Sequence, residues 1–460
     1  MRSRLLLPTL VLVTTLTGVV SSLGAPLVPE IAARYDVPLR VSQWTLTAPV
    51  LVGAVATPLV GRLGAFRRRR PVLVAGLVVV AAGLLLCALP VGLAGLIAGR
   101  ALQGVGLALA PLAIAVARDA LPSSRVSAAI ATLSVSAVAG AGLGYPLTAV
   151  LVEQFGLATA YGVGLVATLA ALVLTVVAVP GSSRADESDI DWTGAALLAS
   201  GSLAILLVIS EADAWGWLSP ATGAVAAGAV VLLIAWTRRS LRIPHPLVDL
   251  GRAGHGRAAA AHVGAVVLGA GTYLMIGIVM VVAQAPSATG YGVGLSLTTA
   301  GLLLVPYSLA NVIGSRLSLV AGDRLRPELV LPVGSGIWLL ASLTLALWHD
   351  SVASLFTTML VAGLGGGFTF AALPRLIVSS VPMLETGSAM GFNQLLRYVG
   401  FSVGSALCPL LLGLFTQEHP THVVAGVVLC AGALFALSAA VTSVLAAHGR
   451  AVPATADRAR

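Results

Sequence analysis

Long apolar segments recur along the whole chain and are separated by short polar stretches. A membrane-spanning helix needs about 20 predominantly apolar residues. Fourteen segments meet this criterion, near residues 5–27, 43–61, 71–90, 93–117, 127–151, 158–179, 192–210, 218–236, 258–283, 294–319, 329–348, 352–374, 390–415 and 421–447. Charged residues make up only 9% of the chain, against about 25% in soluble domains. The pattern predicts an all-α membrane protein and excludes an ordinary soluble enzyme.

The basic residues test this helix count, because they concentrate on the cytoplasmic side of membrane proteins. All 26 are arginines, and they give the chain a net charge of +9. With fourteen spans, Arg34 and Arg40 fall on one side, Arg100 and Arg397 fall within spans, and the other arginines share the opposite side. The sequence therefore predicts cytoplasmic termini. The same distribution explains the positive charge without nucleic-acid binding.

Two longer polar segments divide the chain. Residues 180–191 and 237–257 flank a pair of predicted helices, so that the layout is six helices, two helices and six helices. We predict an N-terminal bundle over 1–180, a linker with two extra helices over 181–257, a C-terminal bundle over 258–447 and a cytoplasmic tail over 448–460. A transporter made of two such halves binds its substrate between them.

Two predicted spans contain an arginine well inside their ends. An ionisable side chain in the bilayer costs about 3 kcal/mol on insertion scales and is a functional candidate. Arg100 shares a helix face with Gln103, which is compatible either with proton-dependent release of a carboxylate or with a permanent structural ion pair. Arg397 stands with Asn393, Gln394 and Tyr398, in a cluster that either lines a cavity or joins helices by hydrogen bonds.

No carboxylate lies deep in a predicted span, although proton-coupled transporters usually contain a titrating group in the membrane. Among the acids at helix ends we select Glu30, which is otherwise a solvated helix-end charge. Gly140, Gly144 and Pro146 in the fifth span are typical either of close packing or of a hinge.

Other chemistry has little support in the sequence. The chain lacks a phosphate-binding loop ending in GKS or GKT, and its histidines and three cysteines show no metal-ligand spacing. We therefore expect no cofactor and no metal.

Several strings resemble the major facilitator superfamily, and within it the fourteen-helix drug:proton antiporter branch. LIAGRALQGVGLALA is similar to the motif of the fourth helix, which implies that Arg100 takes part in proton coupling with Gln103 and Gly104 beside it. VAGAGLGYPLTAVL resembles the antiporter motif of the fifth helix, whose bend would be formed by the residues Gly140, Gly142, Gly144 and Pro146.

Two loops and one helix extend the resemblance. GRLGAFRRRR is similar to the loop after the second helix through Gly61 and Arg62, although it lacks the usual aspartate, and the sister loop after the tenth helix retains Asp323 and Arg324. QWTLTAPVL resembles the start of the second helix in the drug branch. The acidic position that members often have in the first helix falls near Val20.

The resemblance implies a major facilitator fold of two six-helix bundles plus two central helices, in a monomer of the bacterial inner membrane. It also implies export of lipophilic small molecules in exchange for protons. Candidate substrate contacts are the polar residues Gln43, Asn311, Asn393, Gln394, Arg397 and Tyr398. The missing deep acid favours neutral or anionic substrates over multivalent cations. The alternatives are an uncoupled metabolite or nutrient uniporter and a non-transporting membrane enzyme or scaffold.

Overall fold

The computed structural model describes residues 2–22, 28–37, 39–42, 44–64, 69–181, 191–324, 327–382, 385–418 and 423–448. These residues form helices and connections, with no strand among them. Thirteen helices in the described ranges are long and apolar enough to cross a membrane. A further helix, α1 (Arg2–Ser22), has a shorter apolar stretch over Leu5–Val19. These segments match the fourteen predicted spans one by one, which confirms the predicted all-α membrane architecture.

The N-terminal half consists of α1 and the helices that pack around it. They are α2 (Val28–Tyr35), α3 (Leu39–Ser42), α4 (Trp44–Leu63), α5 (Arg69–Ala88), α6 (Gly92–Gly104), η2 (Val105–Ala108), α7 (Leu109–Ala120), α8 (Ser123–Phe155) and α9 (Leu157–Ala178). α6, η2 and α7 form one span with a tighter central turn. Gly140 of α8 lies against the backbone of Thr15 in α1 and leaves no room for a Cβ. This fits the close-packing interpretation of that glycine.

The C-terminal half has the same number of spans. It contains α13 (Gly256–Gln284), α14 (Leu297–Leu302), α15 (Leu304–Arg324), α16 (Pro327–Leu347), α17 (Val352–Val378), α18 (Thr386–Glu418) and α19 (Val423–His448). α15 packs against α17, α13 against α18, and α16 against α19. Trp338 is fully buried in this half, and its ring stacks on Phe435 at a centroid distance of 4.8 Å.

The extra pair consists of α10 (Trp192–Trp215) and α11 (Pro220–Ser240), which pack on each other. α10 also contacts α4 and α18, one helix from each half. Asp191 caps α10 by accepting a hydrogen bond from the backbone N–H of Gly194, and its Oδ1 lies 2.8 Å from Nε of Arg239 in α11. The cap and the ion pair therefore hold α10 and α11 together at one end, beside the junction of the two halves.

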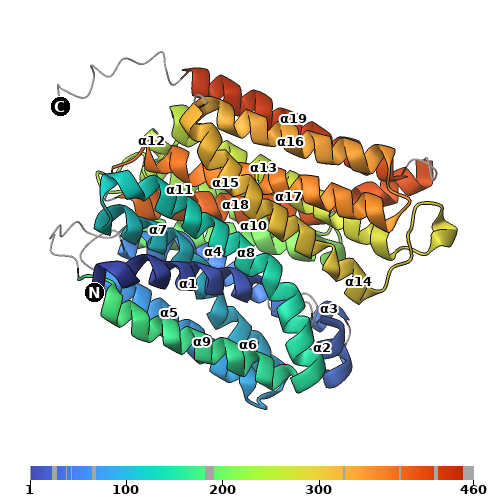
Figure 1. Ribbon diagram of the computed structural model, residues 1–460, viewed down its shortest axis with the longest axis horizontal. Coiled ribbons are helices and arrows are strands. Elements are labelled where there is room, and N and C mark those ends of the chain that lie inside the picture. The colour runs from blue at the N-terminus through green and yellow to red at the C-terminus, as the bar shows by residue number, and fades with distance from the viewer. Residues whose placement is uncertain are drawn as a thin grey trace.

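The helices run roughly parallel, with the blue and teal helices of the N-terminal half below the orange and red helices of the C-terminal half (Figure 1). The start of α1 and the end of α19 lie at the same end of this bundle (Figure 1). The same end holds Arg62, Arg69, Arg118 and Arg375, at or near the ends of α4, α5, α7 and α17, and we call it the arginine-rich end.

Candidate transport site and gate

Arg100 is fully buried within the N-terminal half. Its Nε donates to the backbone oxygen of Thr45 in α4 at 2.9 Å, and its Nη1 donates to Oε1 of Gln103 at 2.7 Å. Gln103 in turn donates to Sγ of Cys87 in α5 at 3.1 Å. Buried charges need such hydrogen bonds to offset their lost hydration. The structure thus brings Arg100 and Gln103 together and uses them to join α6 with α4 and α5.

Arg397 lies within the C-terminal half, about a third of the way along α18. It is ten residues beyond Gly387, or about 15 Å along the helix, half the thickness of a hydrocarbon core of about 30 Å. Its Nη2 donates to Oε1 of Gln394, and its guanidinium carbon lies 5.3 Å from the ring centroid of Phe370 in α17. Such a placement is a cation–π contact.

The other predicted substrate contacts lie in different surroundings. Asn393 is buried and donates through Nδ2 to the backbone oxygen of Ala261 in α13 at 2.9 Å. Asn311 of α15 is buried where Gly366 of α17 approaches it. Tyr398 is buried with Leu51 of α4 in a cluster that crosses between the halves. The predicted α18 cluster is therefore divided between different neighbours.

The two halves meet at the arginine-rich end through glycines of α4 and α18. A Cβ built on Gly387 would lie 2.5 Å from the backbone oxygen of Gly61, and one built on Gly391 would lie 2.7 Å from that of Thr57. Real Cβ atoms essentially never approach so closely. We call these four residues the glycine contact. It closes the arginine-rich end by direct backbone approach of the two halves.

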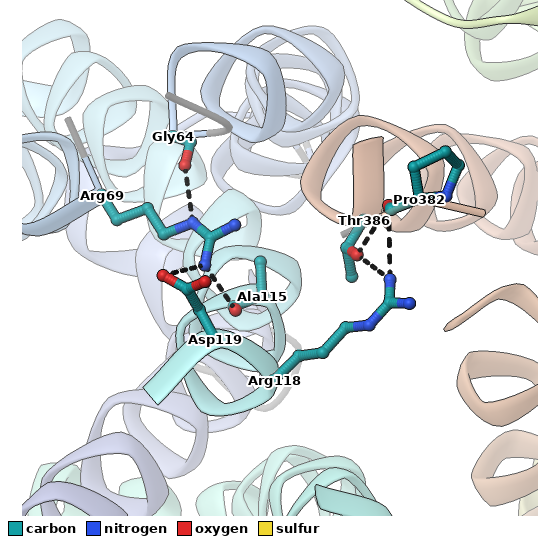
Figure 2. Close-up of polar contacts among 7 residues, drawn as sticks. All are labelled: Gly64, Arg69, Ala115, Arg118, Asp119, Pro382 and Thr386. Atoms are coloured by element: carbon teal, nitrogen blue, oxygen red, sulfur yellow. Dashed lines mark hydrogen bonds and ion pairs between the residues drawn. The ribbon is translucent and has the colours of Figure 1, made fainter. Parts of the chain in front are cut away.

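Arg118 at the end of α7 adds a second link across the halves. It donates through Nη1 to Oγ1 of Thr386 and to the oxygen of Pro382 at 3.3 Å, and through Nη2 to the oxygen of Val381 at 3.1 Å. Figure 2 shows this side chain leaving α7 and ending at the start of α18. These carbonyls and the hydroxyl hold the cation without a carboxylate.

Arg69 braces the helix that carries Arg118. Its Nη1 lies 2.9 Å from Oδ2 of Asp119 and 3.0 Å from the oxygen of Ala115, and its Nε donates to the oxygen of Gly64 at 3.1 Å (Figure 2). This joins the ends of α4, α5 and α7. The carboxylate in this contact comes from α7, at Asp119.

Sequence reasoning did not select Arg69, Arg118, Asp119 or His262 as site residues. His262 of α13 is buried, and its Nδ1 lies 3.4 Å from Nδ2 of Asn393. It lines a small pocket of about 10 Å³ with Asp249, Glu385 and Ser388 among the lining residues. The position of His262 inside a predicted span could have indicated it as a candidate, because the unperturbed side chain of histidine titrates near neutral pH.

Some of the remaining predicted residues are described by the structure, and others lie outside its described part. Gly142 of α8 lies against Ser308 of α15, so it sits at a second contact between the halves, and Gly104 lies against the backbone of Pro49. Arg62 and Gly144 are buried. Outside the described part of the chain lie Gln43 and the side chains of Glu30, Pro146, Asp323 and Arg324.

A larger pocket of about 210 Å³ lies beside the glycine contact, between α4, α10 and α18. Apolar residues line most of it, with Trp192 among them. Trp192 is 59% exposed, so the pocket is reachable from the surface of the spanning region. One side of this pocket is formed by α10 of the extra helix pair, next to the junction of the two halves.

The sequence matches the family model described as Major Facilitator Superfamily over residues 10–289 and 263–458. It is 28% identical over 427 residues to the probable actinorhodin transporter of Streptomyces coelicolor, covering 89% of this chain and 72% of that protein. It is 27% identical over 313 residues to the tetracenomycin C resistance and export protein of Streptomyces glaucescens, covering 64% of this chain and 54% of that protein. The chain thus spans about half the length of the latter relative.

The fold is similar to that of a solved transporter. The crystal structure of the human organic anion transporter MFSD10 superposes with a TM-score of 0.69 at 16% identity, over 96% of this chain and 99% of that chain. At this identity the likeness shows the fold, and it confirms the predicted major facilitator fold. Because the family model covers nearly the whole chain and the fold agrees, the chain belongs to the Major Facilitator Superfamily.

Proposed function

We propose that this protein exports lipophilic small molecules in exchange for protons, as a member of the fourteen-helix drug:proton antiporter branch. Membership of this superfamily supports a transporter in the membrane. The finer proposal is supported by two relatives, one named as a probable actinorhodin transporter and one as a tetracenomycin C resistance and export protein. We place the protein in the inner membrane of a bacterium, as a monomer with cytoplasmic termini.

The observation that carries the transport mechanism is the closed arginine-rich end. The glycine contact and Arg118 join the two halves there, while the polar residues of α18 lie further along the same helix. Parting of α4 and α7 from α18 would open this end, because the glycine contact and the bonds of Arg118 join these helices there. Alternating opening of the two ends then moves substrate from one side to the other.

The substrate site proposed from the sequence lies between the two halves, at Gln43, Asn311, Asn393, Gln394, Arg397 and Tyr398. The buried position of Tyr398 against α4 supports this placement for α18. A lipophilic substrate suits these surroundings, since binding sites for small molecules are mostly apolar with a few placed polar groups. The apolar pocket beside α10 offers such a molecule a route from the membrane.

Proton coupling is assigned to Arg100, Gln103 and Glu30. The complete burial of Arg100 and its bond to α4 support this assignment, and Gln103 extends the network to Cys87 of α5. A proton that changed the partners of this guanidinium would change the packing of three helices. The competing function is an uncoupled metabolite or nutrient uniporter, in which the same arginine is only structural.

Reconstituted protein decides between these functions. We would load liposomes with a pH dye, impose gradients of lipophilic cations, neutral drugs and organic anions, and compare wild type with Arg100→Ala. Arg316→Ala is the matched control, because Arg316 is exposed on α15. We expect substrate-dependent proton flux in the wild type and the control and its loss in Arg100→Ala. Substrate movement without proton flux in the wild type would establish the uniporter instead.

A further inference from the structure

Arg397 carries a positive charge that its own surroundings do not balance. Its aromatic neighbours Phe370, Tyr273, Tyr307 and Tyr398 lie on α17, α13, α15 and α18. The acidic residues of these four helices are confined to the ends, at Asp323 and Glu418. Its hydrogen-bond partner, Gln394, is neutral. Within the described residues Nε of Arg397 is buried without a hydrogen-bond partner. A buried cation in this condition gains strongly from an anion that approaches it.

The contacts of Arg397 differ from those of the arginines that join neighbouring helices. Arg100 bonds to α4, and Arg375 of α17 donates through Nη2 to the oxygen and hydroxyl of Ser318 in α15 at 2.9 and 2.7 Å. Arg397 instead bonds to a residue three positions earlier on its own helix. Among the described residues this bond joins no other helix to α18, which favours the cavity-lining interpretation of Arg397.

A group of aromatic rings lies beside the guanidinium. Phe370 faces it, and Phe401 lies 6.3 Å from Phe370 and 6.2 Å from Tyr398 between ring centroids. Tyr273 of α13 stacks on Phe401 at 4.3 Å and remains 39% exposed. An aromatic ligand can stack in such a group, because ring pairs at these separations attract each other beyond their buried area.

We propose that Arg397 is the anion anchor of the substrate site and that the protein selects planar aromatic anions, with a carboxylate or phenolate on the ring. The fork of the guanidinium matches a carboxylate in a bidentate arrangement, while the rings of Tyr273, Phe370 and Phe401 receive the aromatic body. The proposal rests on the proposed transport function and names its substrate class.

Two dyes with the same xanthene skeleton test this selection. Fluorescein is an anion at neutral pH, and rhodamine 123 is a cation. We would measure binding and liposome transport of both dyes by wild type, Arg397→Gln and Arg397→Lys, with Arg316→Gln as the exposed-arginine control. We expect wild type and control to prefer fluorescein, Arg397→Gln to lose about tenfold or more of its affinity, and Arg397→Lys to fall between them because it keeps the charge without the fork.

The outcomes separate this inference from the proposed function. Transport of rhodamine 123 or of uncharged drugs in preference to fluorescein would leave an exporter but overturn the anion site. Unchanged fluorescein affinity in a folded Arg397→Gln would overturn it as well. If that variant does not fold, the wild-type preference between the two dyes decides. Failure of the wild type to move any compound of the panel would instead refute the proposed function.

Discussion

The glycine contact predicts that one methyl group opens the arginine-rich end. In Gly387→Ala the new Cβ would lie 2.5 Å from the backbone oxygen of Gly61, where real Cβ atoms keep at least 3.0 Å. Because the opposing atom is backbone, α18 and α4 must separate by about 0.5 Å or more. Overpacking of this kind costs about 1–3 kcal/mol, which corresponds to a shift of about 5- to 150-fold in a two-state equilibrium. The clash destabilises only the closed state, because it is absent once α18 and α4 have separated.

The same helix supplies the control. Gly413 of α18 has no atom within 4 Å of its built Cβ, so Gly413→Ala gains the same helix propensity of about 1 kcal/mol without a clash. Both variants should therefore fold, and only Gly387→Ala should change the balance between closed and open ends.

Labelling of a buried reporter cysteine measures this balance. Thr57 is fully buried in the glycine contact, and Thr57→Cys would be introduced after replacement of the three native cysteines. We expect the rate of labelling by a hydrophilic maleimide to rise about 5- to 150-fold in Gly387→Ala and to stay unchanged in Gly413→Ala. An unchanged rate in a folded Gly387→Ala would show that this contact does not hold the end closed.

Three further predictions concern the polar contacts. Arg69→Ala and Asp119→Ala should each lower the free energy of unfolding. A double-mutant cycle in a denaturant titration should give a coupling energy of about 0.5–3 kcal/mol, and additive effects of the two substitutions would contradict the ion pair at 2.9 Å. Arg100→Lys keeps the charge but loses the fork, so transport should fall about tenfold or more with a lower melting temperature, and full activity would show that charge alone suffices. His262→Gln should leave substrate-driven proton flux at the level of His255→Gln at the exposed start of α13, because the proposed coupling residues are Arg100, Gln103 and Glu30; a loss of flux in His262→Gln alone would place this buried histidine in the proton path.

The spans could be predicted from the sequence because a bilayer requires a fixed length of apolar residues. The ends of the spans were predicted less closely than their positions. The fifth span was expected over 127–151, whereas α8 extends over Ser123–Phe155. Hydropathy detects only the apolar part of such a helix, while its polar ends continue the same backbone hydrogen bonding outside the hydrocarbon.

The contact between Arg100 and Gln103 also followed from the sequence, since residues three apart lie on one helix face. The same argument was insufficient for α18. Asn393 and Gln394 are neighbours in the chain, but successive residues of a helix point about 100° apart, and Asn393 contacts α13 while Gln394 bonds to Arg397. The proximity of Arg69 and Asp119 could not be predicted, because it depends on how α5 and α7 pack.

Corresponding arginines of the two halves have unequal roles at the arginine-rich end. Arg118 and Arg375 each lie near the end of the fourth span of their half. Arg375 bonds to Ser318 within its own half, whereas Arg118 crosses to Val381 and Pro382 of the other half. Opening of this end must therefore break the bonds of Arg118 and can leave those of Arg375 intact. The N-terminal half therefore supplies the side chain whose hydrogen bonds must break on opening, and the C-terminal half supplies the carbonyl groups that accept these bonds.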